Sequence, residues 1–187
     1  FEGVPNGTFG YSIVQNVSNC YFLALNTGVV FGTYSQGLTV NQTNFSLLSK
    51  AIHVPASIAG ATGLTVTASQ FGPIDTSGYG CIIESPISAL LYTNNLWYTP
   101  QGGYSIYIAG GIAANQTVIT TNVFAVDTNS TAIYNGTSDI PACIVANTFT
   151  NLTSATNTTG ISWANVLAGD VKIANNAFYQ ITTPGQP

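Results

Sequence analysis

The chain has 187 residues, only 4% of which are charged, and its basic residues are Lys50 and Lys172 alone. An ordinary soluble domain carries roughly 25% charged residues, and binding to nucleic acid or to an anionic membrane surface requires clustered Lys and Arg. We therefore expect no nucleic-acid partner. We also expect no membrane-spanning segment, because the longest apolar run, Ile106 to Ala114, is far shorter than the roughly 20 residues that a spanning helix needs.

Residues 1–15 form a predicted N-terminal arm. Phe9, Tyr11 and Ile13 alternate with small or polar residues and with Val14, and this period of two predicts an extended strand. Such a strand can fold back into its own domain, or it can complete the sheet of a neighbouring subunit by strand addition. We assign 1–15 to this candidate donor strand and 16–187 to a single body domain.

The body contains many short apolar segments separated by turn signals. Cys20–Leu25 and Val29–Tyr34 flank an Asn-Thr-Gly turn and predict a hairpin. Gly63–Gln70 alternates with Leu64, Val66 and Ala68 inward, and Gln116–Asp127 predicts the longest single strand. This spacing predicts an all-β fold, specifically a single-domain β-sandwich of the Ig-like or pilin-like type with an extended N-terminal donor strand.

Asn-X-Ser/Thr glycosylation signals occur at roughly twice the frequency that chance gives for a chain this rich in Ser and Thr. Because the chain begins at Phe1 and contains no Met, we expect a mature, exported, extracellular protein with covalent N-linked glycans. The alternative is a Thr-rich β-strand protein in which these signals arise from composition alone and carry no glycan. The candidate acceptors are Asn6, Asn16, Asn41, Asn44, Asn115, Asn129, Asn135, Asn151 and Asn157.

The three cysteines, Cys20, Cys81 and Cys143, lie far apart and form no Cys-X-X-Cys motif. In an oxidising compartment one bridge and one free thiol are expected, and the similar apolar surroundings favour a disulfide between Cys81 and Cys143. The alternative is three buried cysteines that act as small hydrophobic residues.

Catalytic signatures are absent from the sequence. His53 is the sole histidine, there is no Gly-X-Ser-X-Gly motif, and the Cys and His residues lack zinc-site spacing. The acidic residues are scattered singly along the chain. The sequence leaves open whether two of their carboxylates converge in the fold, as a glycosidase requires. We expect no catalytic residue, no metal site and no cofactor. The acidic residues are Glu2, Asp75, Glu84, Asp127, Asp139 and Asp170.

Taken together, the exported chain, the sandwich pattern, the dense glycosylation signals and the N-terminal strand resemble the archaeal pilins that polymerise by donor-strand complementation, the thread and bundling-pilus subunits. The long apolar N-terminal helix of archaeal type-IV pilins is not found here. The resemblance implies a structural subunit of a glycosylated cell-surface filament for adhesion or biofilm contact. Identical subunits would join head to tail, with Phe9 to Val14 filling a groove of the next one.

Other functions remain open beside the filament subunit. One alternative is a monomeric surface or S-layer-like module, and another is a virion coat protein. An extracellular enzyme is the minor alternative.

Overall fold

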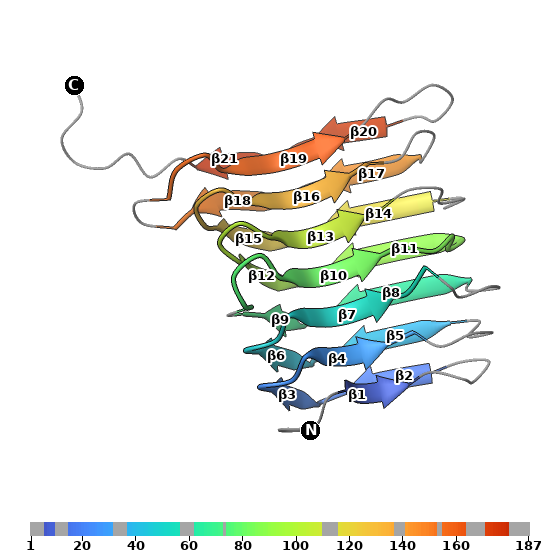
Figure 1. Cartoon of the computed structure of the whole chain (residues 1–187). Helices are drawn as coiled ribbons and strands as arrows, with labels where there is room; N and C mark the ends of the chain where they lie inside the picture. The colour runs from blue at the N-terminus through green and yellow to red at the C-terminus, as the bar shows by residue number, and fades with distance from the viewer. Residues whose placement is uncertain are drawn as a thin grey trace, which may run out of the picture.

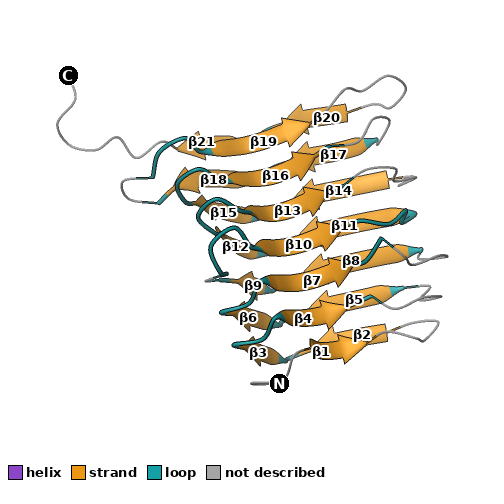
Figure 2. Cartoon of the chain, viewed as in Figure 1, coloured by secondary structure: helices purple, strands orange, loops and turns teal. Residues whose placement is uncertain are grey.

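The computed structural model describes residues 6–9, 15–31, 37–56, 62–72, 74–109, 116–136, 141–152, 155–163 and 171–179. Within these ranges the regular structure consists of strands joined by loops and turns, as Figure 2 shows. The strands pair in parallel in three seven-stranded sheets. The chain therefore winds as a β-solenoid in which each coil contributes one strand to each sheet, and Figure 1 shows the coils stacked from the N-terminal end to the C-terminal end.

Each sheet collects every third strand of the chain. The first sheet contains β1 (Asn6–Phe9), β4 (Thr27–Val30), β7 (Lys50–Val54), β10 (Tyr79–Ile83), β13 (Tyr104–Ile108), β16 (Thr131–Asn135) and β19 (Thr159–Trp163). The second contains β2 (Gln15–Ser18), β5 (Leu38–Asn41), β8 (Gly63–Thr67), β11 (Ala89–Thr93), β14 (Gln116–Thr120), β17 (Ala142–Val145) and β20 (Val171–Ala174). The third contains β3 (Tyr21–Leu23), β6 (Asn44–Ser46), β9 (Gln70–Phe71), β12 (Leu96–Thr99), β15 (Val123–Val126), β18 (Thr148–Asn151) and β21 (Ala177–Tyr179).

The predicted all-β class is confirmed, but the predicted β-sandwich is wrong. The expected hairpin does not exist, because β3 and β4 belong to different sheets and each pairs in parallel with a strand of another coil. The expected long strand is broken at Thr121, whose φ of 55° turns the chain from β14 into β15. Alternation of apolar residues identifies a strand with one buried face, yet it does not say whether the partner strand runs parallel or antiparallel.

The described part of the N-terminal arm pairs within its own chain. β1 lies parallel to β4, with Asn6 opposite Thr27 and Phe9 opposite Val30. The other predicted donor-strand residues, Tyr11, Ile13 and Val14, lie outside the described residues.

The turn between the second and third sheets repeats in every coil. Its first residue has φ between 47° and 56°, a left-handed conformation that costs free energy for any residue except glycine. From the second coil on, the residue that follows supplies a side chain that forms hydrogen bonds with the backbone of an adjacent coil. Asn122, for example, accepts from the backbone N–H of Asn95 at 3.0 Å and donates to the carbonyl of Tyr92 at 3.0 Å.

These polar side chains form a continuous ladder along one corner of the solenoid. Each member from the second coil to the sixth donates its backbone N–H to the corresponding side chain of the next coil, over 2.9 to 3.1 Å. The hydrogen bonds satisfy buried backbone groups that the sharp turn would otherwise leave unpaired. The ladder consists of Thr43, Ser69, Asn95, Asn122, Asn147 and Asn176.

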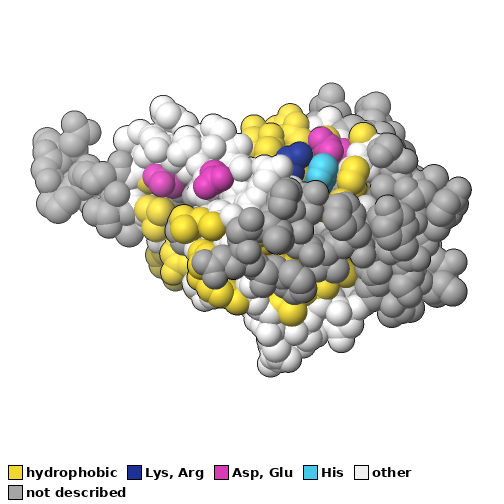
Figure 3. Space-filling view, turned by 60° about the horizontal axis from the view of Figure 1, so that its bottom comes forward, with side chains coloured by type: hydrophobic (Ala, Val, Ile, Leu, Met, Phe, Trp, Pro, Cys, Tyr) yellow, Lys and Arg dark blue, Asp and Glu magenta, His cyan; other side chains and the backbone are white. Residues whose placement is uncertain are grey.

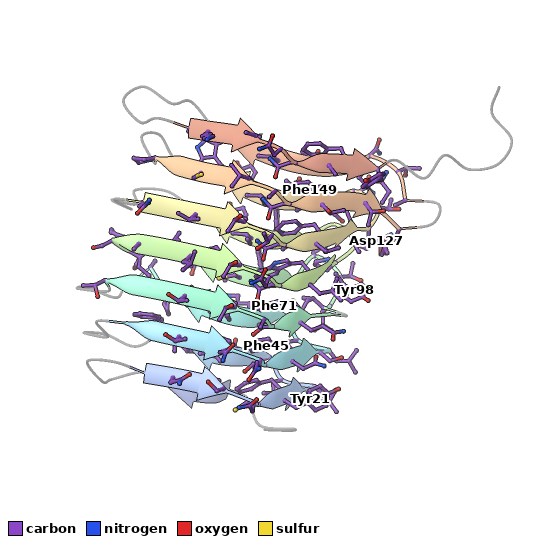
Figure 4. The ribbon with its side chains drawn as sticks, turned by 180° about the vertical axis from the view of Figure 1, so that it is seen from behind. Tyr21, Phe45, Phe71, Tyr98, Asp127 and Phe149 are labelled. Carbon is purple, nitrogen blue, oxygen red and sulfur yellow. The ribbon has the colours of Figure 1, made fainter. Side chains whose placement is uncertain are left out.

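Aromatic rings form a second ladder inside the solenoid, and from the second coil on each ring lies two residues after a polar rung. Consecutive rings stack with centroids 3.8 to 6.0 Å apart and planes within 14° of parallel. Figure 4 shows Phe45, Phe71 and Phe149 of this ladder in the interior. The ladder ends at Phe178, which is 60% exposed in the last described coil, whereas Phe22 in the first coil is fully buried. Its members are Phe22, Phe45, Phe71, Trp97, Phe124, Phe149 and Phe178.

Small residues of the first sheet face this ladder across the core. A Cβ atom added to Gly80 would lie 2.9 Å from the Trp97 ring and 2.6 Å from the backbone oxygen of Ser105. At Gly28 it would lie 3.0 Å from the Phe45 ring and 2.7 Å from the oxygen of Ala51. The aromatic ladder therefore requires a column of small residues opposite it, and this column is Gly28, Ala51, Gly80, Ser105, Ala132 and Gly160.

Replacing Gly80 with Ala tests this packing. We expect a loss of about 1–3 kcal/mol in the free energy of unfolding, because the added methyl group overpacks a site bounded by backbone and by the Trp97 ring. Urea denaturation measures the change. The matched control is Gly63→Ala, since nothing lies within 4 Å of an added Cβ there. Equal stability of the two variants would contradict the packing described here.

Candidate functional site

Four tyrosines cluster on the outward face of the first sheet. The strand register sets Tyr79 of β10 beside Tyr104 of β13, and Tyr107 of β13 beside Tyr134 of β16. Both of these pairs are stacked, with ring centroids 5.6 Å and 5.0 Å apart. Edge-to-face contacts join the two pairs, with Tyr79 and Tyr107 at 5.3 Å and Tyr104 and Tyr107 at 4.7 Å. We call these four residues the tyrosine cluster.

The cluster offers phenol hydroxyls rather than open ring faces. Register partners cover one another's faces along the solenoid, and all four side chains are half-buried. Burial raises the pKa of Tyr104 and of Tyr107, and the neighbouring tyrosine hydroxyls raise both pKa values further, joined at Tyr107 by Glu84. A phenol keeps its proton at neutral pH even at its ordinary pKa, and the raised pKa values extend this to more alkaline pH. Each hydroxyl can therefore both donate and accept a hydrogen bond.

A hydrogen bond between a histidine and a glutamate adjoins the tyrosine cluster. The Nε2 atom of His53 on β7 lies 2.6 Å from Oε2 of Glu84, which follows β10. An ionised carboxylate only accepts, so Nε2–H donates to Glu84 and the other ring nitrogen, Nδ1, faces no partner among the described residues. Lys50 belongs to the same strand as His53 and is the register partner of Tyr79. Figure 3 shows the histidine in cyan against an acidic side chain and beside a basic one.

Sequence reasoning missed this constellation because its members are distant along the chain. His53 and Glu84 are 31 residues apart, so nothing in the local sequence around either residue points to the other. Only the coil repeat brings them together, since Ile82, two residues before Glu84, is the register partner of His53. The coil repeat is the feature of the sequence that could have indicated that these two residues are neighbours.

A pocket of about 220 Å³ lies beside the third sheet, at the turns that lead back to the first. Tyr98, at the end of β12, is 36% exposed, and the Asp127 carboxylate lies just after β15. Figure 4 shows both side chains at the outer edge of the same wall. The full lining is Ile74, Thr76, Tyr98, Thr99, Pro100, Gln101, Asp127 and Leu152.

The predicted glycosylation sites fall into distinct environments. Asn16, Asn129 and Asn157 are exposed, whereas Asn41, Asn44 and Asn151 are half-buried. Asn135 points into the core and is fully buried, which leaves no room for a glycan at this position. The side chain of Asn6 and the whole of Asn115 lie outside the described part of the chain.

The structure has all three cysteines as free thiols, with no bridge between Cys81 and Cys143. Cys81 is fully buried on the inward face of β10 in the first sheet, and Cys143 is half-buried on β17 in the second. The Cys81 thiol instead lies 3.3 Å from the Tyr92 hydroxyl. Cys20 is half-buried and donates to the carbonyl of Ser18.

Burial of the Cys81–Tyr92 pair predicts a loss of stability in alkali. Burial raises the pKa of Cys81 to about 12 and raises that of Tyr92 well above its usual 10. The folded state favours the protonated Cys81 thiol. The stabilisation that this thiol adds to the free energy of unfolding is therefore complete below pH 9 and is lost as the pH rises to 12. From an unfolded value of 9.0, Cys81 alone should lower the free energy of unfolding by about 4 kcal/mol over this range.

Denaturation of the wild type and of Cys81→Ala between pH 7 and 11 measures this effect. The variant should be less stable at pH 7, because it leaves a cavity, but its stability should fall less steeply above pH 9. Equal slopes in the two proteins would show that Cys81 is not protected by the fold.

Among the described residues, no group of three or more His, Cys, Asp or Glu side chains is placed to hold a metal ion. Nor does any helix in the described ranges have the length and apolar character to cross a membrane. Comparison with known proteins gives no match to a family model, to a curated sequence or to a solved structure.

Proposed function

We propose that this β-solenoid is an extracellular glycan-binding module, and that the tyrosine cluster with His53, Glu84 and Lys50 is its binding face. The observation that carries the proposal is the gathering of four half-buried tyrosines and the His53–Glu84 hydrogen bond on the outward face of four neighbouring strands of the first sheet, β7, β10, β13 and β16.

The chemistry of this face suits a ligand rich in hydroxyl groups. Phenol hydroxyls both donate and accept, and the imidazole and the carboxylate add hydrogen bonds that are strengthened by charge. Aromatic edges between them provide apolar contacts for the C–H groups of a sugar ring. With only 4% charged residues in the chain, a site that collects Lys50, His53 and Glu84 is an exception on this surface.

The geometry of the solenoid favours an extended ligand. Neighbouring parallel strands are about 4.8 Å apart, so equivalent side chains repeat at this interval along the axis, and solenoids use such extended surfaces for binding. A polysaccharide also presents the same groups at a regular interval. We therefore expect an oligosaccharide to lie along the axis, across the strands.

The role as a filament subunit stays a prediction, as do the extracellular location and the use of the exposed glycosylation sites. The pairing of Asn6–Phe9 with β4 of the same chain gives no support to donation of that part of the arm. A monomeric surface module agrees equally well with a glycan-binding face.

The double variant Tyr104→Phe/Tyr107→Phe tests the proposal. Phenylalanine keeps the ring contacts and removes two hydroxyl groups, so we expect unchanged thermal stability but affinity weaker by about tenfold or more, as for two lost hydrogen bonds. A glycan array first identifies an oligosaccharide that binds the wild type, and calorimetry then compares the variants.

The matched control is Tyr21→Phe, which removes a hydroxyl from an exposed tyrosine on the third sheet and should leave the affinity unchanged. The proposal fails if no oligosaccharide binds the wild type. It also fails if the double variant binds as tightly as the wild type.

A further inference from the structure

The pocket beside the third sheet is built from four successive coils. Ile74 and Thr76 come from the turn before β10, and Pro100 and Gln101 from the turn before β13. Asp127 precedes β16, and Leu152 follows β18. The pocket therefore lies along the stack of turns, and its lining includes none of the four residues of the tyrosine cluster.

Backbone hydrogen bonds between neighbouring turns fix its walls. The N–H of Ser77 donates to the carbonyl of Gln101 at 2.7 Å, and the N–H of Gly102 donates to that of Thr128 at 3.0 Å. Ser130 Oγ donates to the carbonyl of Pro100 at 2.6 Å. A preformed pocket of this kind binds a ligand without a large cost in ordering loops.

The position of Tyr98 is fixed by a glycine. A Cβ atom at Gly72 would lie 2.4 Å from Cδ2 of Tyr98 and 2.6 Å from its Cβ. The ring thus rests directly on the backbone of the preceding coil, and any larger residue at position 72 would displace it.

One oxygen of the Asp127 carboxylate accepts a hydrogen bond from the backbone. Its Oδ1 accepts from the N–H of Thr128 at 2.6 Å, which orients the carboxylate. No described residue donates to Oδ2. An oriented carboxylate oxygen is a strong acceptor for a ligand hydroxyl, since hydrogen bonds to ionised groups are shorter and stronger than neutral ones.

From this arrangement we propose that the pocket binds a single pyranose ring. Tyr98, Ile74, Pro100 and Leu152 provide apolar contact for the C–H groups of a sugar. Asp127 accepts from its hydroxyls, and the exposed Gln101 and Thr76 can both donate and accept. The volume of about 220 Å³ is below the range of 300 to 1,000 Å³ typical of sites for drug-sized ligands, which favours one ring over an oligosaccharide.

Saturation-transfer NMR with the methyl glycosides of glucose, galactose, mannose and glucosamine tests the inference on the full chain. We expect transfer to at least one neutral glycoside, with Tyr98 ring signals shifted on titration. Asp127→Asn keeps the bond to Thr128 and removes the charge, so binding should weaken by about tenfold or more. Gly72→Ala should weaken it by displacing Tyr98.

Tyr21→Phe and the double variant Tyr104→Phe/Tyr107→Phe serve as controls and should bind the glycoside normally, which separates this pocket from the tyrosine cluster. The inference is overturned if no glycoside binds, or if Asp127→Asn binds like the wild type. Binding of the glucosamine derivative alone would also overturn it, because the pocket would then recognise an ammonium group beside the carboxylate and the aromatic ring.

Discussion

In-register stacking of parallel strands is the constraint on which the rest of this structure depends. Every residue in a coil lies about 4.8 Å from its equivalent in the next coil, so each position along the coil must accept a column of similar side chains. The aromatic ladder satisfies this by stacking rings, and the polar ladder satisfies it by bonding each side chain to the backbone of the next coil. The small-residue column follows, because the rings occupy the space that larger side chains would need.

Local sequence patterns predicted the all-β class and some of the strands, but not the arrangement of the strands. The alternation in Gly63–Gln70 correctly placed Leu64 and Val66 in the core. It failed at Ala68, which is exposed and has φ of 49° because it opens a turn. Alanine carries no turn signal of its own, and the hydrogen bonds that stabilise this turn come from Ser69 and from Asn95 of the next coil.

A repeat was present in the sequence and would have predicted the solenoid. Asn followed two residues later by an aromatic residue recurs at Asn95, Asn122, Asn147 and Asn176, with 25 to 29 residues between successive copies. Periods of this length indicate stacked structural units. The candidate site depends on the same repeat, because the contact between His53 and Glu84 exists only through the register of β7 with β10. The pocket could not have been predicted, since it requires the relative positions of four turns.

Because charged side chains are scarce in this chain, their positions are informative about the kind of ligand that the surface can bind. Within the described residues, Lys50, His53 and Glu84 lie together on the first sheet, and Asp127 lines the pocket by the third. The remaining described charges are exposed, Asp75 in the turn before β10 and Lys172 on β20. Elsewhere the walls display mainly hydroxyl, amide and apolar side chains, as the white and yellow surface in Figure 3 shows for one face. Such a surface offers hydrogen bonds without strong electrostatic attraction, which is the chemistry that suits uncharged sugars.

Disulfide trapping across neighbouring coils tests the register most directly. In a protein with Cys20→Ser, Cys81→Ala and Cys143→Ser, cysteines at Thr65 and Leu91 should bridge on mild oxidation, because they are register partners on β8 and β11 and adjacent strands bring Cα atoms within disulfide reach. Cysteines at Thr65 and Val118, two coils apart, should not bridge, since about 10 Å separates them. Bridging of the second pair, or failure of the first in a folded protein, would contradict the solenoid register and the sites built on it.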